Sequence, residues 1–424
     1  MASKIAVIGT GYVGLTTGAC LAHLGHDVVC ADIDEAKVEA LNNGEIPILE
    51  DGLDNLVIEG RRAGRLRFVV GAANAVGDRE FVYLCVPTPQ GDDGSADLSY
   101  IESAAREIGP ELAPEAIVIN KSTVPVGSTR VVEQALQRGD ISVVSNPEFL
   151  REGSAVHDFL NPDRVVIGAV DQAAAIRMAG LYIGLTAPIM VTDPASAETI
   201  KYASNAFLAT KISFVNAVAA VCEAVGADVN DVVLGMGYDR RIGQEFLKPG
   251  PGWGGSCFPK DTVALIHIAE EAGYDFRLLK GVVDVNNEQF ERVVRKVVAA
   301  VGGDVSGRHI SAWGLTFKAR TDDTRMSPAI EVIKRLQALG AEVTAYDPAI
   351  RMDIEGITVA NDPMTACKGS ELLMILTEWD EFKWVDLDEV AEQMTERRIV
   401  DTRNLLDRSR AQRAGFEYQG IGRR

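Results

Sequence analysis

Residues 4–34 read KIAVIGTGYVGLTTGACLAHLGHDVVCADID, which is an apolar strand, a glycine turn, an amphipathic helix and a second strand in direct succession. Gly9, Gly11 and Gly14 form the pattern GxGxxG between the first strand and the helix, and Asp32 follows at the end of the second strand. A glycine pattern in this full context is typical of a dinucleotide-binding Rossmann unit. The sequence therefore predicts an α/β fold with an N-terminal Rossmann domain.

Each residue of this pattern has a physical task. Gly9 is expected to make the tight turn, Gly11 to leave room for a pyrophosphate at the helix N-terminus, and Gly14 to let helix and strand pack closely. Asp32 is expected to bond the ribose 2′-hydroxyl and to repel a 2′-phosphate, which predicts NAD rather than NADP. Lys37 leaves an alternative open. As a cation near Asp32 it could tolerate the 2′-phosphate of NADP, whereas as a solvated charge on the helix it would not affect cofactor choice.

Three later strands of the first half also end in polar residues, in the segments FVYLCVPTP, AIVINKSTVPVGST and ISVVSNPEFLREGSA. Ligands of an open parallel sheet bind beyond the carboxyl ends of its strands. We therefore expect Thr88, Thr123, Glu148 and Glu152 to lie near the reactive end of the cofactor. The alternative is that these residues only form turns and start a helix.

Composition and charge limit the class of protein. The chain has 424 residues, enough for two or three domains, and its 42 Lys and Arg against 61 Asp and Glu leave a formal net charge of −19. That balance argues against nucleic acid or an anionic membrane as a partner. The first residues show no hydrophobic signal region, and no uninterrupted apolar run reaches membrane-spanning length, so we expect a cytoplasmic protein. Six cysteines without a CxxC pair predict reduced thiols and no metal site.

The middle of the chain predicts one long helix, because residues 197–225 contain no proline and no internal glycine. Lys201 and Asn205 are four residues apart and share one face of this helix. A lysine and an amide together can hold a hydroxyl or a developing oxyanion. The alternative is an exposed lysine beside an asparagine that bonds the backbone.

A single thiol follows in a glycine loop, GPGWGGSCFPKD at residues 250–261. The glycines allow a ligand to approach the main chain, and Pro259 suits the first position of a helix. Cys257 would then precede a helix N-terminus, where a thiol has a lowered pKa and is a better nucleophile. The alternative is a small buried hydrophobe, as most free cysteines are.

The last third of the chain repeats part of the first. LGHDVVCAD at 24–32 and LGAEVTAYD at 339–347 share the pattern Leu-Gly-x-x-Val-x-x-x-Asp, which predicts a second, Rossmann-like α/β domain. Its turn, GLTFKARTDDTR, lacks the glycine pattern, so we do not expect it to bind a dinucleotide in the same way. Lys318, Arg320 and Arg325 could meet the phosphates of a different ligand or be merely solvated. We expect three domains, at residues 1–195, 196–300 and 301–424.

With these motifs assembled, the chain resembles the nucleotide-sugar dehydrogenase family. The resemblance rests on GTGYVG, KSTVPVGST, NPEFLREG, KYASNAFLATKISFVN, RIGQEFLKPGPGWGGSCFPKD and GLTFKARTDDTR, which follow one another in the family's order. Such enzymes oxidise the C6 alcohol of a nucleotide sugar to a carboxylate with two NAD, through a cysteine thiohemiacetal and thioester. NAFLATKISFVN and RIGQEFLKPG resemble the UDP-glucose branch most closely, with UDP-N-acetylmannosamine and GDP-mannose as alternative substrates.

The resemblance also implies roles for individual residues. Cys257 matches the nucleophile, Glu148 the position for thioester hydrolysis, and Lys201, Asn205 and Asp261 those that handle the C6 oxygen and a water. The whole expected catalytic set is Cys257, Lys201, Asn205, Asp261, Glu148, Glu152 and Thr123. Cofactor contacts are expected at Gly9, Gly11, Tyr12, Val13, Gly14, Asp32, Lys37, Thr88, Thr123, Glu152, Lys260 and Arg325. Contacts with the UDP-sugar are expected at Glu148, Phe149, Leu150, Arg151, Glu152, Lys201, Asn205, Arg241, Phe246, Leu247, Lys248, Pro249, Gly250, Gly254, Phe258 and Lys318.

Arg241 matches an arginine that reaches a neighbouring subunit's site, which implies a homo-oligomer, at least a dimer. Two other hypotheses compete with the resemblance. A two-electron hydroxyacid dehydrogenase also joins a Rossmann domain to a long helix with Lys and Asn, but needs neither Cys257 nor a third domain. A non-catalytic NAD-sensing module would bind NAD and form no NADH. The C-terminal residues QGIGRR are expected to be flexible.

Overall fold

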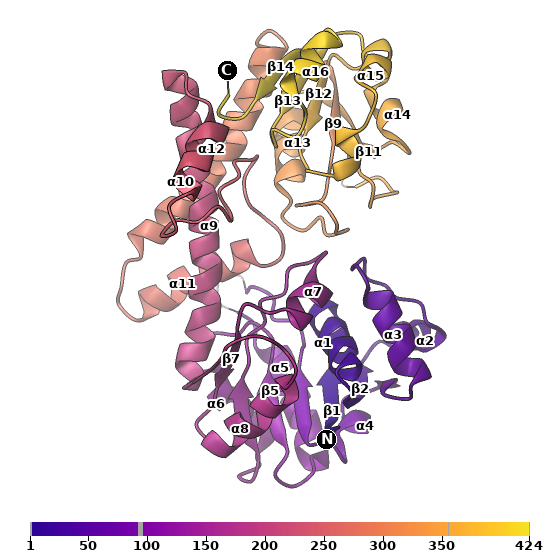
Figure 1. Cartoon of the computed structure of the whole chain (residues 1–424), viewed down its shortest axis with the longest axis vertical. Helices are drawn as coiled ribbons and strands as arrows, with labels where there is room; N and C mark the ends of the chain where they lie inside the picture. Colours follow the sequence, from indigo (N-terminus) through magenta and orange to yellow (C-terminus); the bar gives the residue numbers. More distant parts are fainter. Residues whose placement is uncertain (1, 92–95, 355, 424) are drawn as a thin grey trace. The chain divides into compact units, whose positions relative to one another are not determined.

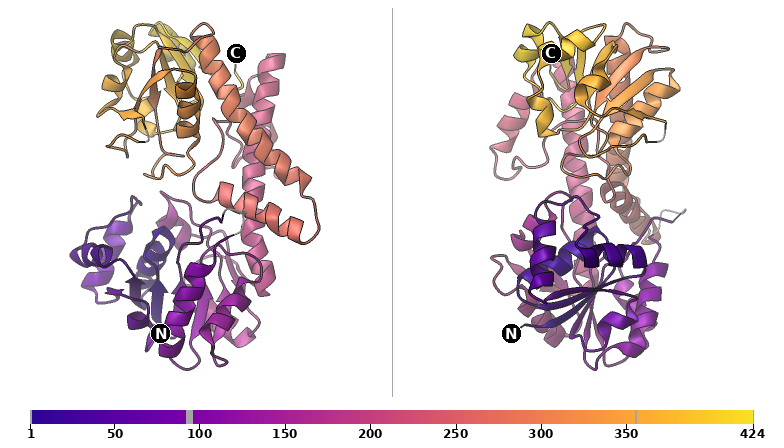
Figure 2. Two further views of the ribbon diagram at one scale, coloured as in Figure 1. Left: turned by 180° about the vertical axis from the view of Figure 1, so that it is seen from behind. Right: turned by 90° about the vertical axis from the view of Figure 1, so that its right-hand side faces the viewer.

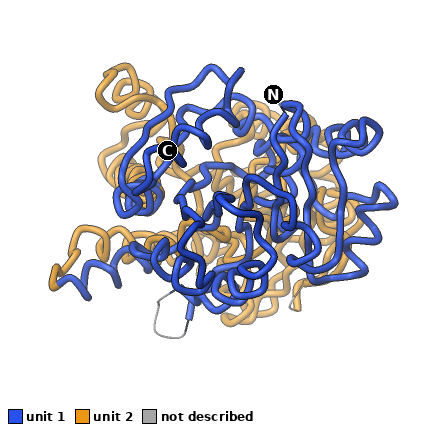
Figure 3. Tube along the Cα trace, turned by 90° about the horizontal axis from the view of Figure 1, so that it is seen from below, with its two compact units in different colours: residues 1–204, 263–272 blue, residues 205–262, 273–424 orange. Residues whose placement is uncertain are grey.

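The computed structural model describes residues 2–91, 96–354 and 356–423. It confirms the predicted α/β class, with a Rossmann domain first, a helical region with one long helix, and a second α/β domain (Figure 1). The chain divides into two compact units, Met1–Ser204 with Val263–Ala272, and Asn205–Thr262 with Gly273–Arg424 (Figure 3).

The sheet of the first unit has eight strands in the order β3-β2-β1-β4-β5-β6-β7-β8. The strands are β1 Lys4–Ile8, β2 Asp27–Asp32, β3 Leu66–Val70, β4 Phe81–Leu84, β5 Ile117–Asn120, β6 Ser142–Ser145, β7 Val165–Gly168 and β8 Ile189–Thr192. Neighbouring strands are parallel except for the antiparallel pair β6 and β7. In β1, Ile8 lies opposite Ala31 of β2 and Leu84 of β4, so the turns after these strands share one edge of the sheet. This is the edge at which a Rossmann sheet binds its ligand.

Helices cover both faces of this sheet. They are α1 Tyr12–His23, α2 Glu35–Asn43, α3 Leu53–Arg62, α4 Ala73–Val76, α5 Ser99–Ile108, α6 Ser128–Leu136, α7 Ala155–Leu160 and α8 Gln172–Ala179, with the 3-10 turns η1 Gly109–Glu111 and η2 Gly180–Tyr182. Ile5 and Val7 of β1 belong to the core formed with α1, α3 and α8, whereas Ala6 and Ile8 belong to the core formed with α5 and α6. Burial on both faces explains why the strand sequences are almost wholly apolar.

The central helices are α9 Pro194–Val225, α10 Val229–Gly237, α11 Phe258–Glu271 and α12 Arg277–Ala300. The long helix predicted at 197–225 is α9, which starts three residues earlier because the first turn of a helix tolerates a proline. Among the described residues, α9 alone is long and apolar enough to cross a membrane by length and composition, and 33% of its most apolar window is buried. The core helix of a soluble protein meets the same criterion.

The sheet of the second unit has the order β11-β10-β9-β12-β13-β14, with all pairs parallel (Figure 2). Its strands are β9 His309–Trp313, β10 Glu342–Tyr346, β11 Thr358–Val359, β12 Leu372–Ile375, β13 Arg398–Asp401 and β14 Glu417–Gly420. The remaining helices are α13 Pro328–Ala338, α14 Pro363–Cys367, η3 Asp380–Lys383, α15 Leu387–Gln393 and α16 Arg408–Arg413. The strand order repeats that of the first six strands, which confirms the Rossmann-like second domain.

The expectation of a flexible C-terminal tail is wrong for its described residues, and Arg424 lies outside them. Residues up to Gly420 complete the sheet as β14, and Ile421 is buried. The Gly422 N–H donates to Glu223 Oε1 at 2.8 Å, and Arg423 donates to Asp228 Oδ2 at 3.0 Å. The tail is ordered because its strand pairs with β13, and because Gly422 and Arg423 bond Glu223 of α9 and Asp228 before α10.

Candidate active site

The glycine turn after β1 uses its three glycines in different ways. Gly9 has φ +93°, and a Cβ there would lie 2.6 Å from the Cys85 carbonyl oxygen. A Cβ on Gly14 would lie 1.9 Å from the Gly9 carbonyl oxygen, so only glycine allows α1 to approach β1 this closely. A Cβ on Gly11 would meet no described atom within 4 Å. The space at the N-terminus of α1, beside Tyr12 and Val13, is therefore open to a pyrophosphate.

Asp32 ends β2 beside this turn. Its Oδ2 accepts hydrogen bonds from the Thr10 N–H at 2.9 Å and the Thr10 hydroxyl at 2.6 Å. Lys37 Nζ lies 3.2 Å from the same oxygen, and the Lys37 side chain is 25% exposed. Burial acts to raise the pKa of Asp32, but the Thr10 and Asp34 hydrogen bonds and the Lys37 charge outweigh it and lower the pKa to about 2. The carboxylate is thus ionised and oriented at the position where a ribose hydroxyl is expected.

The turns after β4 and β5 contact each other directly. The Thr88 hydroxyl donates to the Thr123 carbonyl oxygen at 2.8 Å, and the Ser122 hydroxyl donates to the Val86 carbonyl oxygen at 2.7 Å. Thr88 is buried and Thr123 is half-buried. The structure therefore brings the two threonines together, with Thr88 holding the turn that presents Thr123.

Glu148 and Lys201 form a buried ion pair. Lys201 Nζ of α9 donates to Glu148 Oε1 at 2.7 Å, and each side chain is 5% exposed. Glu148 Oε2 accepts from the Leu150 N–H at 2.6 Å. Burial acts to raise the pKa of Glu148, but Lys201 and the Leu150 N–H outweigh it and leave the pKa below its ordinary value. Glu148 is therefore a carboxylate at neutral pH, placed by a lysine on another element.

The residues around this pair carry further cations. Lys121 is buried at the end of β5, donates to Asn146 Oδ1 at 2.9 Å, and has its pKa lowered by burial to about 8. The Arg164 guanidinium lies 3.6 Å from the ring centroid of Phe149. Exposed Arg151 pairs with Asp158 at 2.6 Å, while Leu150 and Glu152 are half-buried. Sequence analysis missed Lys121, although it follows a buried strand inside the quoted KSTVPVGST segment.

Asn205, Lys260 and Asp261 form a second buried cluster. Asn205 Nδ2 of α9 donates to Asp261 Oδ2 at 2.6 Å, and Lys260 Nζ donates to Asp261 Oδ1 at 2.7 Å. The Asp261 side chain is 1% exposed. Its N–H donates to the Cys257 carbonyl oxygen at 2.9 Å, which is the first helical hydrogen bond at the start of α11. The predicted one-turn spacing of Cys257 and Asp261 is therefore present.

Cys257 differs in environment from the other cysteines. All six lie in the described part of the chain, and five are buried, whereas Cys257 is half-buried directly before α11. Burial raises the pKa of the Cys20, Cys85 and Cys367 thiols to about 12, which keeps them protonated. The Ser256 hydroxyl lies 3.6 Å from Cys257 Sγ. Cys257 is thus the accessible thiol of the chain.

Side-chain amides hold the glycine loop in place. Asn216 of α9 accepts from the Gly250 N–H at 2.8 Å, and Gln289 of α12 donates to the Gly250 carbonyl oxygen at 2.7 Å. Asn286 of α12 accepts from the Trp253 N–H at 2.8 Å and donates to its carbonyl oxygen at 3.0 Å. Sequence analysis missed these amides, because their spacing from the loop is visible only in the folded chain.

The loop glycines also have a structural reason that the sequence did not reveal. A Cβ on Gly252 would lie 2.5 Å from the Phe290 ring, and one on Gly255 would lie 2.9 Å from the Phe317 ring. A Cβ on Gly254 would lie 2.0 Å from the Met326 carbonyl oxygen. At these three positions a side chain would collide with a neighbouring segment, so the glycines allow the loop to pack closely against the protein.

The residues before the loop form a short turn. Phe246 has φ +60°, and its ring centroid lies 6.2 Å from that of Phe258. Leu247 and Pro249 are buried, and Lys248 is exposed. Arg241 is exposed and pairs with Asp239 at 2.6 Å.

The turn after β9 resembles the first one in its aspartate. Asp347, at the end of β10, accepts from the Thr316 N–H and hydroxyl at 3.1 and 3.0 Å, as Asp32 accepts from Thr10. Trp379 Nε1 also donates to Asp347, at 3.1 Å, and Asp347 is fully buried. Asp347 is therefore closed to solvent, whereas the Asp32 side chain is 13% exposed.

Basic residues surround this second turn. Lys318 Nζ lies 5.6 Å from the ring centroid of Phe317, Arg320 pairs with Asp380 at 3.4 Å, and Arg325 pairs with Asp323 at 2.7 Å. The ion pairs of Arg320 and Arg325 use exposed aspartate or arginine side chains, so their strength is limited by solvent.

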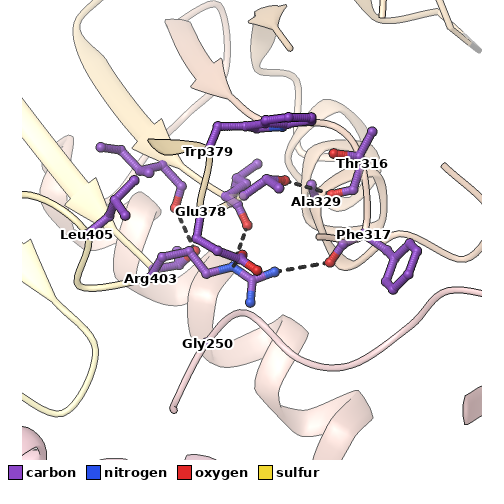
Figure 4. Close-up of polar contacts among 12 residues, drawn as sticks. Gly250, Thr316, Phe317, Ala329, Glu378, Trp379, Arg403 and Leu405 are labelled. Atoms are coloured by element: carbon purple, nitrogen blue, oxygen red, sulfur yellow. Dashed lines mark hydrogen bonds and ion pairs between the residues drawn. The ribbon is translucent and has the colours of Figure 1, made fainter. Parts of the chain in front are cut away.

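Arg403 joins several segments and was missed by sequence analysis (Figure 4). It donates to the carbonyl oxygens of Leu376 and Phe317 at 2.8 and 3.3 Å, and lies 3.1 Å from Glu378. A Cβ on Gly250 would lie 3.0 Å from its guanidinium. Arg403 comes two residues after β13 ends, so the rule that polar residues follow parallel strands would have selected it.

Comparisons with known proteins match along the chain. Residues 3–186 match the NAD binding domain of the UDP-glucose/GDP-mannose dehydrogenase family, residues 195–288 its central domain, and residues 311–408 its UDP binding domain. A protein of Rhizobium meliloti (strain 1021) named UDP-glucose 6-dehydrogenase is 48% identical over 434 residues, covering 99% of both chains.

Two solved structures are also similar. That of a UDP-glucose dehydrogenase from the hyperthermophilic archaeon Pyrobaculum islandicum is 37% identical with a TM-score of 0.91, covering 100% of this chain and 98% of that one. That of a UDP-D-ManNAc dehydrogenase from Pyrococcus horikoshii is 29% identical with a TM-score of 0.88, covering 99% of both. The prediction of NAD as the cofactor is confirmed by the matching NAD binding domain. The chain therefore belongs to the UDP-glucose/GDP-mannose dehydrogenase family.

Proposed function

We propose that this protein oxidises UDP-glucose to UDP-glucuronate with two NAD. The observation that carries the proposal is the half-buried thiol of Cys257, one helical turn before an Asp261 carboxylate that Asn205 and Lys260 hold on both oxygens. A thiol in this setting is needed only when an aldehyde must be oxidised further, because an aldehyde has no comparable hydride to release until a nucleophile adds to it.

In the first oxidation, the C6 alcohol loses a hydride and its hydroxyl proton to give an aldehyde. NAD, when bound, accepts a hydride in each oxidation. We assign the handling of the C6 oxygen to Lys201 and Asn205, and of a nearby water to Asp261. The ammonium of Lys201 can stabilise developing negative charge on that oxygen.

In the second oxidation, the Cys257 thiol adds across the aldehyde: its sulfur bonds the carbon and its proton passes to the oxygen, which gives a thiohemiacetal. Loss of a second hydride from that carbon, with the hydroxyl proton, gives a thioester. Water then adds to the thioester and expels the thiol, leaving the carboxylate. We assign Glu148 to this hydrolysis, because it is an ionised carboxylate held in place by Lys201 and can accept a proton from water.

We assign NAD to the N-terminal α/β domain, and the UDP part of the substrate to the C-terminal α/β domain together with the glycine loop of the central region. The NAD contacts are expected at Gly9, Gly11, Asp32, Thr123 and the other cofactor residues given above, and the UDP part at Gly254, Lys318 and the 246–250 turn. The division into domains 1–195, 196–300 and 301–424 is supported by the three matched family models, whose bounds lie close to it.

UDP-glucose is proposed as the sugar because the relative from Rhizobium meliloti and the structure from Pyrobaculum islandicum both carry its name. The alternative, another nucleotide sugar, is favoured by the likeness to the UDP-D-ManNAc dehydrogenase structure, which has the lower identity. A two-electron hydroxyacid dehydrogenase would have no use for Cys257 or for the UDP binding domain. A non-catalytic NAD-sensing module would have no use for the buried Glu148–Lys201 pair.

We also propose a cytoplasmic homodimer, in which a second copy covers an apolar face of α9. Phe207, Phe214, Val221 and Val225 recur at helical spacing on this face and are 53% to 71% exposed. Polar residues of the same helix, such as Lys201, Asn205 and Asn216, are buried in protein contacts. A membrane-spanning role for α9 would place these polar contacts in hydrocarbon, which is costly.

The test is the amount of NADH formed per UDP-glucose consumed, with limiting sugar and excess NAD. We expect two NADH and a carboxylate for the wild-type protein, and loss of acid by at least about a thousandfold in Cys257→Ser, which retains only weak aldehyde chemistry. The control is Cys222→Ala, a buried thiol elsewhere that should leave the ratio at two. One NADH per sugar, or normal acid yield from Cys257→Ser, would contradict the thioester role.

A further inference from the structure

The Glu50 carboxylate lies buried between two segments that are far apart in the sequence. Its Oε2 accepts the Gly153 N–H at 2.7 Å and is hydrogen-bonded to the Tyr12 hydroxyl. The same hydroxyl lies 2.9 Å from the Arg151 carbonyl oxygen. Glu50 is only 6% exposed, although acidic residues are rarely buried unless they are paired.

The Glu50 side chain has no cationic partner among the described residues. No Lys or Arg of the described residues forms an ion pair with it, and its Oε1 is buried without a hydrogen-bond partner in the same part of the chain. An unbalanced buried carboxylate destabilises the fold, so its position needs a compensating reason. Burial, followed by the hydrogen bond with Glu50, raises the pKa of Tyr12, which therefore remains a protonated donor.

The two segments that Glu50 joins have different ligands. Tyr12 is the first residue of α1, whose N-terminus faces the expected pyrophosphate of NAD. Arg151 and Gly153 belong to the turn after β6 that begins with Glu148, and Gly153 has φ +78°. Glu50 itself precedes α3 and belongs to neither segment.

We propose that Glu50 is a positioning residue that links Tyr12 to the 151–153 turn, so that NAD on α1 orders the segment that grips the nucleotide sugar. The assignment of the sugar to this segment rests on the proposed function; the link to NAD does not. When one ligand orders a shared segment, the second ligand loses less conformational entropy on binding. The two ligands should therefore bind with positive coupling, and by linkage each should tighten the other equally.

The direct test is hydrogen exchange in a peptide that covers the Gly153 amide, measured on the full chain with and without NADH. In the wild-type protein, we expect NADH to slow exchange there by about fivefold or more, the lower end of ordinary coupling between two sites. In Glu50→Gln and in Tyr12→Phe, we expect a change of less than about twofold. Because both variants remove the same link, the double variant should respond to NADH as each single variant does.

Asp51→Asn is the matched control, since it makes the same carboxylate-to-amide change on the exposed neighbour of Glu50. It should respond to NADH as the wild-type protein does. The proposal would be overturned if NADH did not change the exchange rate in the wild-type protein. It would also be overturned if NADH slowed exchange in Glu50→Gln and Tyr12→Phe as much as in the wild-type protein.

A second measurement separates this proposal from the proposed function. The dissociation constant of UDP is measured with and without saturating NADH, a pair of ligands that cannot react. We expect NADH to tighten UDP binding in the wild-type protein and Asp51→Asn, and to have little effect in Glu50→Gln. A protein that forms two NADH per UDP-glucose but shows no exchange response keeps its function and loses the link. A protein that forms no NADH but shows the exchange response keeps the link and loses the function.

Discussion

The Asp32 carboxylate shares one of its oxygens between Thr10 and Lys37, and its side chain is 13% exposed. At this scale, hydrogen bonds decide the charge of a group that burial alone would neutralise. The same competition sets the pKa of Glu148, where the Lys201 charge and hydrogen bonds outweigh the effect of burial. Lys121 has no described carboxylate as an ion-pair partner, and burial prevails there, lowering its pKa to about 8. The charge of a residue in the site therefore depends on its partners more than on its depth.

The change Asp32→Asn should weaken NAD binding about tenfold, because a charge-assisted bond to the ribose is lost, and should reduce the preference for NAD over NADP. Dissociation constants for both cofactors measure this. Glu39→Gln, an exposed change on α2, should leave both constants unchanged. Equal constants for wild-type protein and Asp32→Asn would remove Asp32 from the cofactor site.

The same change predicts a pH dependence of stability. The pKa of Asp32 is lowered from 3.8 to about 2 in the folded protein, so its stabilising contribution is present above pH 4 and is lost as pH falls through 2. Asp32→Asn should therefore cost about 2 kcal/mol of unfolding free energy at neutral pH. Urea denaturation of both proteins at pH 7 and at pH 3 should show the difference shrinking in acid.

At the scale of elements, side chains from two helices, α9 and α12, hold the glycine loop that precedes Cys257. Asn216 of α9 and Asn286 and Gln289 of α12 satisfy the backbone of the 250–253 loop. Gly254 allows this loop to lie against the Met326 carbonyl oxygen. The thiol at the end of the loop is positioned by packing at several points, because no regular element reaches it before α11.

The change Gly254→Ala should therefore be severe. Its Cβ would lie 2.0 Å from the Met326 oxygen and 2.8 Å from Pro328, so the loop must move and Cys257 with it. We expect a loss of about 3 kcal/mol or more in unfolding free energy and loss of acid production. The control Gly281→Ala lies within α12 with no described atom within 4 Å of its Cβ, and should be neutral or stabilising by up to about 1 kcal/mol. The denaturant midpoints of Gly254→Ala and Gly281→Ala measure this difference, and equal midpoints for the two variants would refute the packing argument.

At the scale of the whole molecule, two sheets of the same strand order serve different ligands. The first keeps the glycine turn open at Gly11, and in the second Trp379 closes over Asp347. The helix α9 contributes Lys201 to one cluster and Asn205 to the other. Its remaining apolar face is exposed in the single chain, so the proposed dimer interface would lie on the same helix that carries Lys201 and Asn205.

The change Phe214→Glu should convert the proposed dimer to a monomer, because it places a charge on the face that the second copy covers. Sedimentation or light scattering in the absence of detergent measures the mass. Val170→Glu, at an 83% exposed position outside α9, should leave the mass unchanged. A monomeric wild-type protein, or a dimer that survives Phe214→Glu, would contradict this interface.

The sequence by itself determined the fold class, the long helix and the family, because these depend on local order along the chain: GxGxxG between strand and helix, the repeated Leu-Gly-x-x-Val-x-x-x-Asp, and the absence of helix breakers between 197 and 225. It also selected residues that meet in the structure, such as Glu148 with Lys201 and Asn205 with Asp261. Only the tertiary structure identified Asn286 and Glu50, whose partners are 33 to 103 residues away. It also showed that Gly252, Gly254 and Gly255 make room for protein atoms and that the C-terminal residues are ordered. These features depend on which distant segments pack together, and packing leaves no periodic signal in the sequence.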